Sequence, residues 1–207
     1  TRLRVLDLFS GIGGFSLGLE RTGGFETVAF CEIEEYPRKV LTKHWPDIPI
    51  HRDVRKLGKA DVPTANVIVG GFPCQDISIG GNQDGIDAER SGLWSDFVRL
   101  IGEIRPKYAL IENVANLLAG PDGTGRWFAR ILSDLARIGY DAEWRNIPAA
   151  AVGSPQSRQR VWIVAYPRGA GFQGSIFEMC RIRSFAGETS AQFGDKRISV
   201  GSGWPEL

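Results

Sequence analysis

The 207-residue sequence has little of what several protein classes depend on, with only three cysteines and two histidines. An odd number of cysteines without CxxC spacing argues against a disulfide framework and favours a reducing, cytoplasmic location. The histidines, His44 and His51, have no cysteine near them in the sequence, so we expect no metal site. No run of about 18 apolar residues occurs either, so we expect no membrane partner.

Charge of one sign is also missing, because 25 Lys and Arg residues face 24 Asp and Glu residues, for a net charge of +1. A nucleic-acid partner would therefore have to be held by a local basic surface. Hydrophobic residues make up 43% and charged residues 24% of the chain, which is typical of globular proteins and excludes disorder and coiled coil. The length suits one α/β domain.

Apolar runs and helical patterns alternate along the sequence. Helices are predicted at residues 14–21, 34–44, 93–104 and 125–138. Strands are predicted at 3–9, 26–33, 66–71 and 108–112, with a short extended segment at 48–54 and a final strand pair at 141–149 and 160–166. This order indicates an α/β fold with a mostly parallel, doubly wound sheet, in which ligands bind at the carboxyl ends of the strands.

A glycine-rich turn, DLFSGIGG from Asp7 to Gly14, joins the first predicted strand to the first predicted helix. Glycines there let the backbone approach a ligand closely and take positive φ. The turn is not a phosphate-binding P-loop, because no Gly-Lys-Ser/Thr follows. Ser16 stands where the dinucleotide fingerprint requires glycine, which disfavours an NAD-dependent oxidoreductase.

Two carboxylates follow at the next predicted strand ends. Glu32 lies 21 residues after Gly11, where an acidic side chain can accept hydrogen bonds from both ribose hydroxyls. Asp53 follows the extended segment and is placed to accept a hydrogen bond from an adenine amino group. Together with the glycine turn they predict a nucleoside pocket, and the alternative is that both are ordinary solvated charges.

The stretch GGFPCQDIS, residues 70–78, places Cys74 just past a buried strand, behind a proline. A structural cysteine would lie within the apolar run, so this position favours a nucleophilic thiol. Cys31 and Cys180 lack such a context and are assigned no chemistry. The polar, glycine-rich residues 76–91 would, in isolation, be a solvated connection.

These motifs, with Cys31-Glu32 at a strand end, Glu112-Asn113-Val114 and QSRQR at residues 156–160, resemble in order and spacing those of the C5-cytosine DNA methyltransferases. The resemblance extends from about residue 5 to about residue 165. It implies a Rossmann-like methyltransferase fold that uses S-adenosyl-L-methionine, releases S-adenosyl-L-homocysteine and acts on double-stranded DNA. A tRNA substrate, or an inactive remnant that binds cofactor or nucleic acid, remain alternatives.

The chemistry of cytosine explains the catalytic residues. C5 becomes nucleophilic once a thiolate adds to C6, which Cys74 would do, and once N3 is protonated. Glu112, at the end of an apolar strand, is expected to have a raised pKa and to supply that proton. The resemblance implies that Arg158 and Arg160, which share one face of an extended segment, hold the cytosine O2, the cysteine loop and Glu112.

The remaining site residues fall into two groups. The predicted cofactor-binding residues are Asp7, Phe9, Ser10, Gly11, Ile12, Gly13, Gly14, Glu32, Ile33, Asp53, Val54, Gly71 and Pro73. The predicted substrate-binding residues are Phe72, Gln75, Ser78, Asn113, Val114 and Gln156. Since the target base must be flipped out of the duplex, the loop 76–91 is predicted to close over it on hinges at Gly80, Gly81 and Gly85.

Residues 1–167 are predicted to form the catalytic domain and residues 168–207 a reduced or truncated target-recognition region. Family members usually continue into a target-recognition region and a closing segment beside the cofactor. No such closing segment is recognisable after Pro167, and QFGD at residues 192–195 lacks the expected asparagine. The chain also begins without methionine. We therefore expect either a truncated chain or a second polypeptide that supplies the rest.

Overall fold

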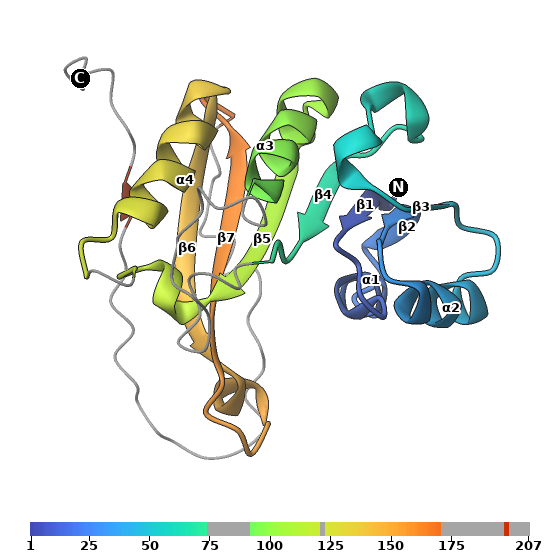
Figure 1. Cartoon of the computed structure of the whole chain (residues 1–207), viewed down its shortest axis with the longest axis horizontal. Helices are drawn as coiled ribbons and strands as arrows, with labels where there is room; N and C mark the ends of the chain where they lie inside the picture. The colour runs from blue at the N-terminus through green and yellow to red at the C-terminus, as the bar shows by residue number, and fades with distance from the viewer. Residues whose placement is uncertain (74–91, 121–122, 171–196, 199–207) are drawn as a thin grey trace.

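An eight-stranded sheet runs through the residues described by the computed structural model, 1–73, 92–120, 123–170 and 197–198 (Figure 1). The strand order is β3-β2-β1-β4-β5-β7-β6-β8. The strands are β1 (Leu3–Leu8), β2 (Phe25–Cys31), β3 (Ile50–His51), β4 (Val67–Gly70), β5 (Tyr108–Val114), β6 (Tyr140–Pro148), β7 (Gln159–Pro167) and β8 (Arg197–Ile198). The first five pair in parallel, whereas β7 is antiparallel to both β5 and β6. The mostly parallel sheet with an antiparallel pair near its end confirms the prediction.

Helices cover both faces of the sheet, as a doubly wound fold requires. They are α1 (Gly14–Glu20), α2 (Glu35–His44), α3 (Leu93–Ile104) and α4 (Arg126–Arg137). Leu6 and Leu8 of β1 belong to the large core formed with α3 and α4, whereas Val5 packs on the opposite face with α1. This alternation along β1 shows that the first strand lies between two helical layers.

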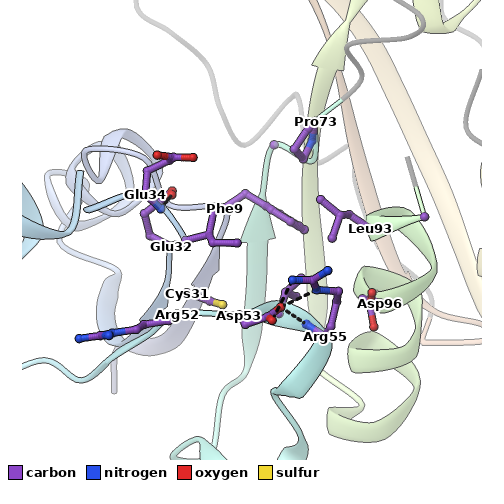
Figure 2. A pocket seen from close by; sticks show the side chains of 14 residues that line it. Phe9, Cys31, Glu32, Glu34, Arg52, Asp53, Arg55, Pro73, Leu93 and Asp96 are labelled. Atoms are coloured by element: carbon purple, nitrogen blue, oxygen red, sulfur yellow. Dashed lines mark hydrogen bonds and ion pairs between the residues drawn. The ribbon is translucent and has the colours of Figure 1, made fainter. Parts of the chain in front are cut away.

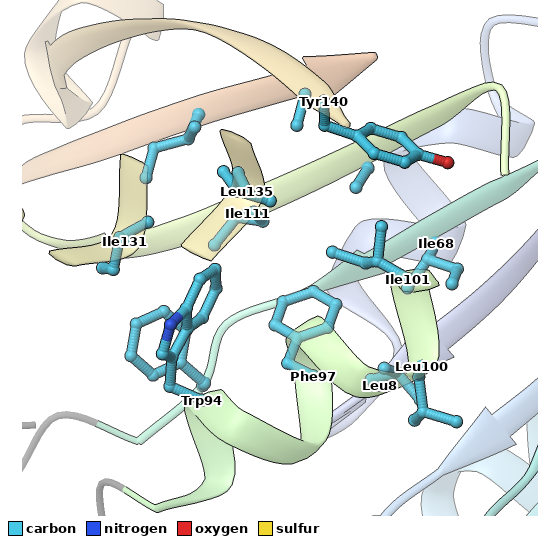
Figure 3. Close-up of a cluster of buried hydrophobic side chains, with 14 of the residues drawn as sticks. Leu8, Ile68, Trp94, Phe97, Leu100, Ile101, Ile111, Ile131, Leu135 and Tyr140 are labelled. Atoms are coloured by element: carbon cyan, nitrogen blue, oxygen red, sulfur yellow. The ribbon is translucent and has the colours of Figure 1, made fainter. Parts of the chain in front are cut away.

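The large core explains why α3 forms where the sequence predicts it. Its apolar residues recur at helical spacing, and the helix buries Trp94, Phe97, Leu100 and Ile101 against the sheet (Figure 3). Ile131 and Leu135 of α4 belong to the same buried cluster and complete the hydrophobic core on this face of the sheet. Among the described residues, no helix has the length and apolar character needed to cross a membrane.

Two predicted segments differ from the structure for local reasons. The extended segment at 48–54 contains only the two-residue β3, because Asp53 accepts a hydrogen bond from the backbone N–H of Arg55 and starts the 3₁₀ helix η1 (Val54–Lys56). β5 extends two residues beyond its predicted end, because Asn113 and Val114 pair with β7. β8, which pairs with β6, was not predicted.

Candidate active site

A cavity of about 1080 Å³ opens at the carboxyl ends of β1, β2 and β4, where ligands bind in such sheets (Figure 2). Seven of the predicted cofactor-binding residues line it. These are Phe9, Glu32, Ile33, Asp53, Val54, Gly71 and Pro73. The cavity is also lined by residues that the sequence did not single out for this purpose, namely Cys31, Glu34, Arg52, Arg55, Gly92, Leu93 and Asp96.

The glycine turn has the backbone that was predicted for it. Gly11 and Gly13 have φ values of 52° and 88°, in the left-handed region. A Cβ atom on Gly13 would lie 2.6 Å from the ring of Trp45, so only glycine fits there. The backbone N–H of Ser10 donates to the Cys31 carbonyl at 3.2 Å, which ties the turn to the end of β2. The turn residues Ser10, Gly11, Ile12, Gly13 and Gly14 thus form a fixed backbone beside the cavity.

Glu32 reaches from the end of β2 to that turn. Its side chain is buried, and its Oε2 accepts a hydrogen bond from the backbone N–H of Gly11 at 2.7 Å. Its Oε1 accepts another from the backbone N–H of Glu34 at 2.8 Å. A carboxylate oxygen can accept more than one hydrogen bond, so both oxygens keep capacity for a ligand in the cavity.

Asp53 lies across the cavity from Glu32 (Figure 2). Its Oδ1 accepts from Arg55 Nε at 2.9 Å and its Oδ2 from Arg55 Nη2 at 3.0 Å. The hydrogen bond from Arg55 lowers the pKa of Asp53, so the carboxylate is ionised and can accept a hydrogen bond from an amino group. A ligand there would share Asp53 with Arg55.

Apolar side chains complete the cavity. Phe9 has a φ of 52°, a strained value for a residue with a side chain, and its ring meets Phe97 edge to face at 6.0 Å. Ile33 is 61% exposed at the rim. These two side chains offer surfaces against which a flat base can pack.

Asp7, predicted to bind cofactor, is fully buried behind the turn and is not among the residues that line the cavity. Its Oδ2 accepts a hydrogen bond from Ser16 Oγ at 2.7 Å. Within the described residues its Oδ1 has no hydrogen-bond partner. Burial raises the pKa of Asp7 from 3.8 to about 7. Asp7 therefore supports the turn from the side of α1.

Glu112 lies near the end of β5, one strand away from the cavity edge at β4. Burial raises its pKa above the ordinary value, while the charges of Arg160 and Arg158 oppose the rise. Arg160 Nε lies 2.8 Å from Glu112 Oε1. The raised pKa agrees with the prediction, and a carboxyl group of this kind can hold a proton for transfer.

The ends of β4 and β5 are in direct contact. Asn113, which is buried, donates from Nδ2 to the carbonyl of Phe72 at 3.2 Å. A Cβ atom on Gly71 would lie 2.8 Å from Glu112 Oε2, so a larger residue here would displace the carboxyl group. The segment that leads to Cys74 therefore starts against the Glu112 carboxylate.

Several predicted residues have other placements. Arg158 and Gln156 are exposed, and Val114 is half-buried. Of the predicted arginine pair, Arg160 contacts Glu112, whereas Arg158 acts on its pKa through charge. Cys74, Gln75, Ser78, Cys180 and the loop 76–91 with its glycine hinges lie outside the described residues, as does most of the predicted domain 168–207.

Cys31 lines the cavity, although it was assigned no chemistry. Burial raises the pKa of its thiol to about 12, so it is protonated and a poor nucleophile near neutral pH. Trp45 and Arg99 were missed, because their partners are distant in the sequence. The Trp45 ring supports Gly13, and Arg99 joins α3 to η1.

Comparison with known proteins places this geometry in a family. The model of the C-5 cytosine-specific DNA methylase family matches residues 3–189. The type II methyltransferase M1.ScrFI of Lactococcus lactis subsp. cremoris is 36% identical over 178 residues, covering 86% of this chain and 45% of the relative. For the type II methyltransferase M2.BsuMI of Bacillus subtilis the identity is 37% over 167 residues, covering 79% of this chain and 42% of the relative.

A solved structure is similar as well. A prophage-encoded E. coli protein, assigned as a DNA modification methyltransferase, superposes with a TM-score of 0.66 at 27% identity, covering 80% of this chain and 47% of that one. The present chain spans less than half the length of these three proteins. Since the family model matches most of the sequence and both relatives exceed 30% identity, the chain belongs to the C-5 cytosine-specific DNA methylase family.

Proposed function

We propose that this chain carries the cofactor-binding and catalytic part of a DNA cytosine C5-methyltransferase. One observation carries the proposal. The β4 end, which leads to Cys74, has the cavity on one side and Glu112 on the other, with Gly71 lining the cavity and lying against the Glu112 carboxylate. A cofactor in the cavity and a base held at Glu112 would therefore meet beside the thiol.

The cavity fits S-adenosyl-L-methionine by the chemistry of its lining. Glu32 can accept hydrogen bonds from the ribose hydroxyls, and Asp53 can accept one from the adenine amino group. Phe9 and Ile33 provide apolar surfaces for the base, and nothing lies within 4 Å of where a Cβ of Gly11 would be, which leaves room for close approach. When bound, S-adenosyl-L-methionine supplies an electrophilic methyl group.

The protein residues then make C5 of cytosine reactive. The Cys74 thiolate adds to C6 and forms an S–C6 bond. The C5–C6 π electrons shift to the C4–C5 bond, and the former C4–N3 π electrons shift to N3. Protonated Glu112 donates its proton to N3, which leaves an enamine with a nucleophilic C5. Transfer of the methyl group to C5 would release S-adenosyl-L-homocysteine. Loss of the C5 proton to a base, cleavage of the S–C6 bond and return of the N3 proton to Glu112 then restore the aromatic ring and the free thiolate.

Duplex DNA is the proposed substrate, so the cytosine has to leave the stack, which costs a few kcal/mol. Phe72, Gln75, Ser78, Asn113, Val114 and Gln156 are proposed to contact the flipped base or its flanks. Arg158 and Arg160 would hold its O2. Because the chain spans less than half of its relatives, we propose that further chain or a second polypeptide completes target recognition.

Transfer of a radiolabelled methyl group to duplex DNA and to tRNA, measured side by side, tests the substrate. We expect label on DNA, and loss of that label with Glu112→Gln, because an amide does not protonate N3. Label on tRNA alone would show that the same chemistry serves an RNA substrate. Label on neither would contradict turnover by this chain and favour a binding remnant.

A further inference from the structure

The wall of the cavity opposite Glu32 is built from two segments about 40 residues apart in sequence. One is the loop after β3, which contributes Asp53, Val54 and Arg55, and the other is the start of α3, which contributes Leu93 and Asp96 (Figure 2). The loop is tied to the sheet by the two-residue edge strand β3 and by the buried side chains of Val54 and Leu57. A further contact ties the backbone of the loop to α3.

Arg99 of α3 makes that contact. Its Nη1 donates to the carbonyl of Leu57 at 3.0 Å, and its Nη2 donates to the carbonyl of Val54 at 3.0 Å. The same guanidinium bonds Asp96 at 3.2 Å and Glu103 at 3.0 Å. One side chain therefore hydrogen-bonds to the backbone at both ends of η1, the 3₁₀ helix after Asp53. It also pairs with Asp96, which lines the cavity.

Arg99 itself is not among the residues that line the cavity. Its two backbone acceptors explain how it acts at a distance, because the Val54 carbonyl belongs to the residue directly after Asp53. A planar guanidinium can serve four acceptors in a fixed arrangement, whereas a lysine ammonium is a compact charge that cannot span the same set.

We propose that Arg99 is a positioning residue for adenine selectivity: it fixes the Asp53–Val54 edge of the cavity against α3 so that Asp53 meets the exocyclic amino group. The inference rests on the proposed cofactor site. Loss of the guanidinium should therefore reduce the selectivity for adenine more than the stability of the fold, because the buried side chains of Val54 and Leu57 still anchor the loop.

Calorimetry with S-adenosylhomocysteine and with its inosine analogue, which carries a 6-oxo group in place of the amino group, tests this. The wild-type chain should prefer the adenosine compound, and Arg99→Lys should bind it about tenfold more weakly while losing the preference. Arg137→Lys is the control, because Arg137 of α4 is largely exposed and neither it nor its ion-pair partner Asp134 lines the cavity. It should behave as wild type.

The outcomes separate the inference from the function on which it rests. No binding of either compound by the wild-type chain would contradict the proposed cofactor site. Wild-type binding without a base preference, or an unchanged preference in Arg99→Lys, would overturn the role of Arg99. An equal loss of affinity for both compounds in Arg99→Lys would also overturn it, because that result indicates general loosening.

Discussion

Three carboxyl groups near the carboxyl ends of β1, β2 and β5 have different surroundings, and those surroundings set what each can do. Glu32 accepts two backbone N–H groups, which suits an anion that holds a ligand. Glu112 is half-buried and pairs with the Arg160 guanidinium. Burial raises its pKa, and the guanidinium still stabilises the carboxylate, so the group can both hold and release a proton. Asp7 is fully buried, and burial favours the neutral acid although the Ser16 hydroxyl, which donates to the carboxyl group, opposes this.

Asp7 should make the stability of the protein depend on pH. Its pKa is raised from 3.8 to about 7 in the folded chain, so between these values the folded state binds more protons than the unfolded state. The free energy of unfolding should therefore fall as pH rises from 4 to 7, by up to about 1.4 kcal/mol per pH unit from this group. Denaturant titrations of wild type and Asp7→Asn measure the difference.

Asp7→Asn cannot ionise, so the difference in stability between the two proteins should grow in favour of the variant up to pH 7 and then stay constant. Ser16→Ala serves as a second comparison, because removing the hydroxyl that donates to Asp7 should raise the pKa of the carboxyl further. A difference between wild type and Asp7→Asn that does not vary with pH would contradict the buried neutral acid.

The pKa of Glu112 should respond to its arginine partner. Arg160→Gln removes a positive charge 2.8 Å from Oε1, and that charge lowers a pKa which burial raises. The pKa of Glu112 should therefore rise further, as followed by ¹³C NMR of the labelled carboxyl group. Arg168→Gln, which removes an ion pair with Asp141 instead, should leave it unchanged. A lower pKa of Glu112 in Arg160→Gln would show that the Arg160 charge does not counteract the rise in pKa caused by burial.

At the scale of elements, the contact between the β4 and β5 ends brings the cavity next to the Glu112 cluster, which consists of Glu112, Arg158 and Arg160. Gly71→Ala would place a methyl group 2.8 Å from Glu112 Oε2, so the carboxyl group or the strand end must move. We expect methyl transfer to fall by at least about tenfold, since misplacing a catalytic group is costly. The measurement is the transfer rate at saturating cofactor, with the thermal midpoint recorded alongside.

Gly18→Ala is the matched control for that substitution. Gly18 lies in α1, and nothing lies within 4 Å of an added Cβ there. It should keep full activity and gain slightly in helix stability. Equal activity in Gly71→Ala and Gly18→Ala would mean that the contact between Gly71 and the Glu112 carboxyl group does not set the position of Glu112.

The elements also show what the sequence could predict. Two elements were predicted almost to the residue. The apolar residues of α3 recur at helical spacing, and β4, whose four residues are all buried, is a continuous apolar run. The bounds of β3 and the presence of η1 were not predicted, because a single hydrogen bond, which Asp53 accepts from the backbone N–H of Arg55, starts η1 where the extended segment was expected to continue. β8 and the contacts of Arg99 depend on partners far apart in the chain, which local pattern does not encode.

The candidate site divides in the same way. Glu32 and Asp53 were predicted from their positions at strand ends, and both line the cavity. The pairing of Arg160 with Glu112, 48 residues apart, came from the family resemblance and not from periodicity. Ser16, which argued against a dinucleotide site, is the hydrogen-bond partner of Asp7, a role that requires knowing where α1 packs.

For the molecule as a whole, one edge of the sheet carries both halves of the proposed chemistry. The cavity lies at the carboxyl ends of β1, β2 and β4. The Glu112 cluster lies at the end of β5 and the start of the antiparallel β7, with the approach to Cys74 between the two. Family membership is shown by the match over residues 3–189, and the chain spans less than half the length of the curated relatives M1.ScrFI and M2.BsuMI.

Covalent trapping tests that arrangement most directly. Duplex DNA with 5-fluorocytosine at the target site cannot lose fluorine as a cation, so a protein that has attacked C6 and methylated C5 stays attached. With S-adenosyl-L-methionine present, a preparation active in methyl transfer should form this adduct, Cys31→Ser and Cys180→Ser should retain it, and Cys74→Ser should abolish it. Trapping that persists at the wild-type level in Cys74→Ser would contradict the assignment of Cys74 as the nucleophile.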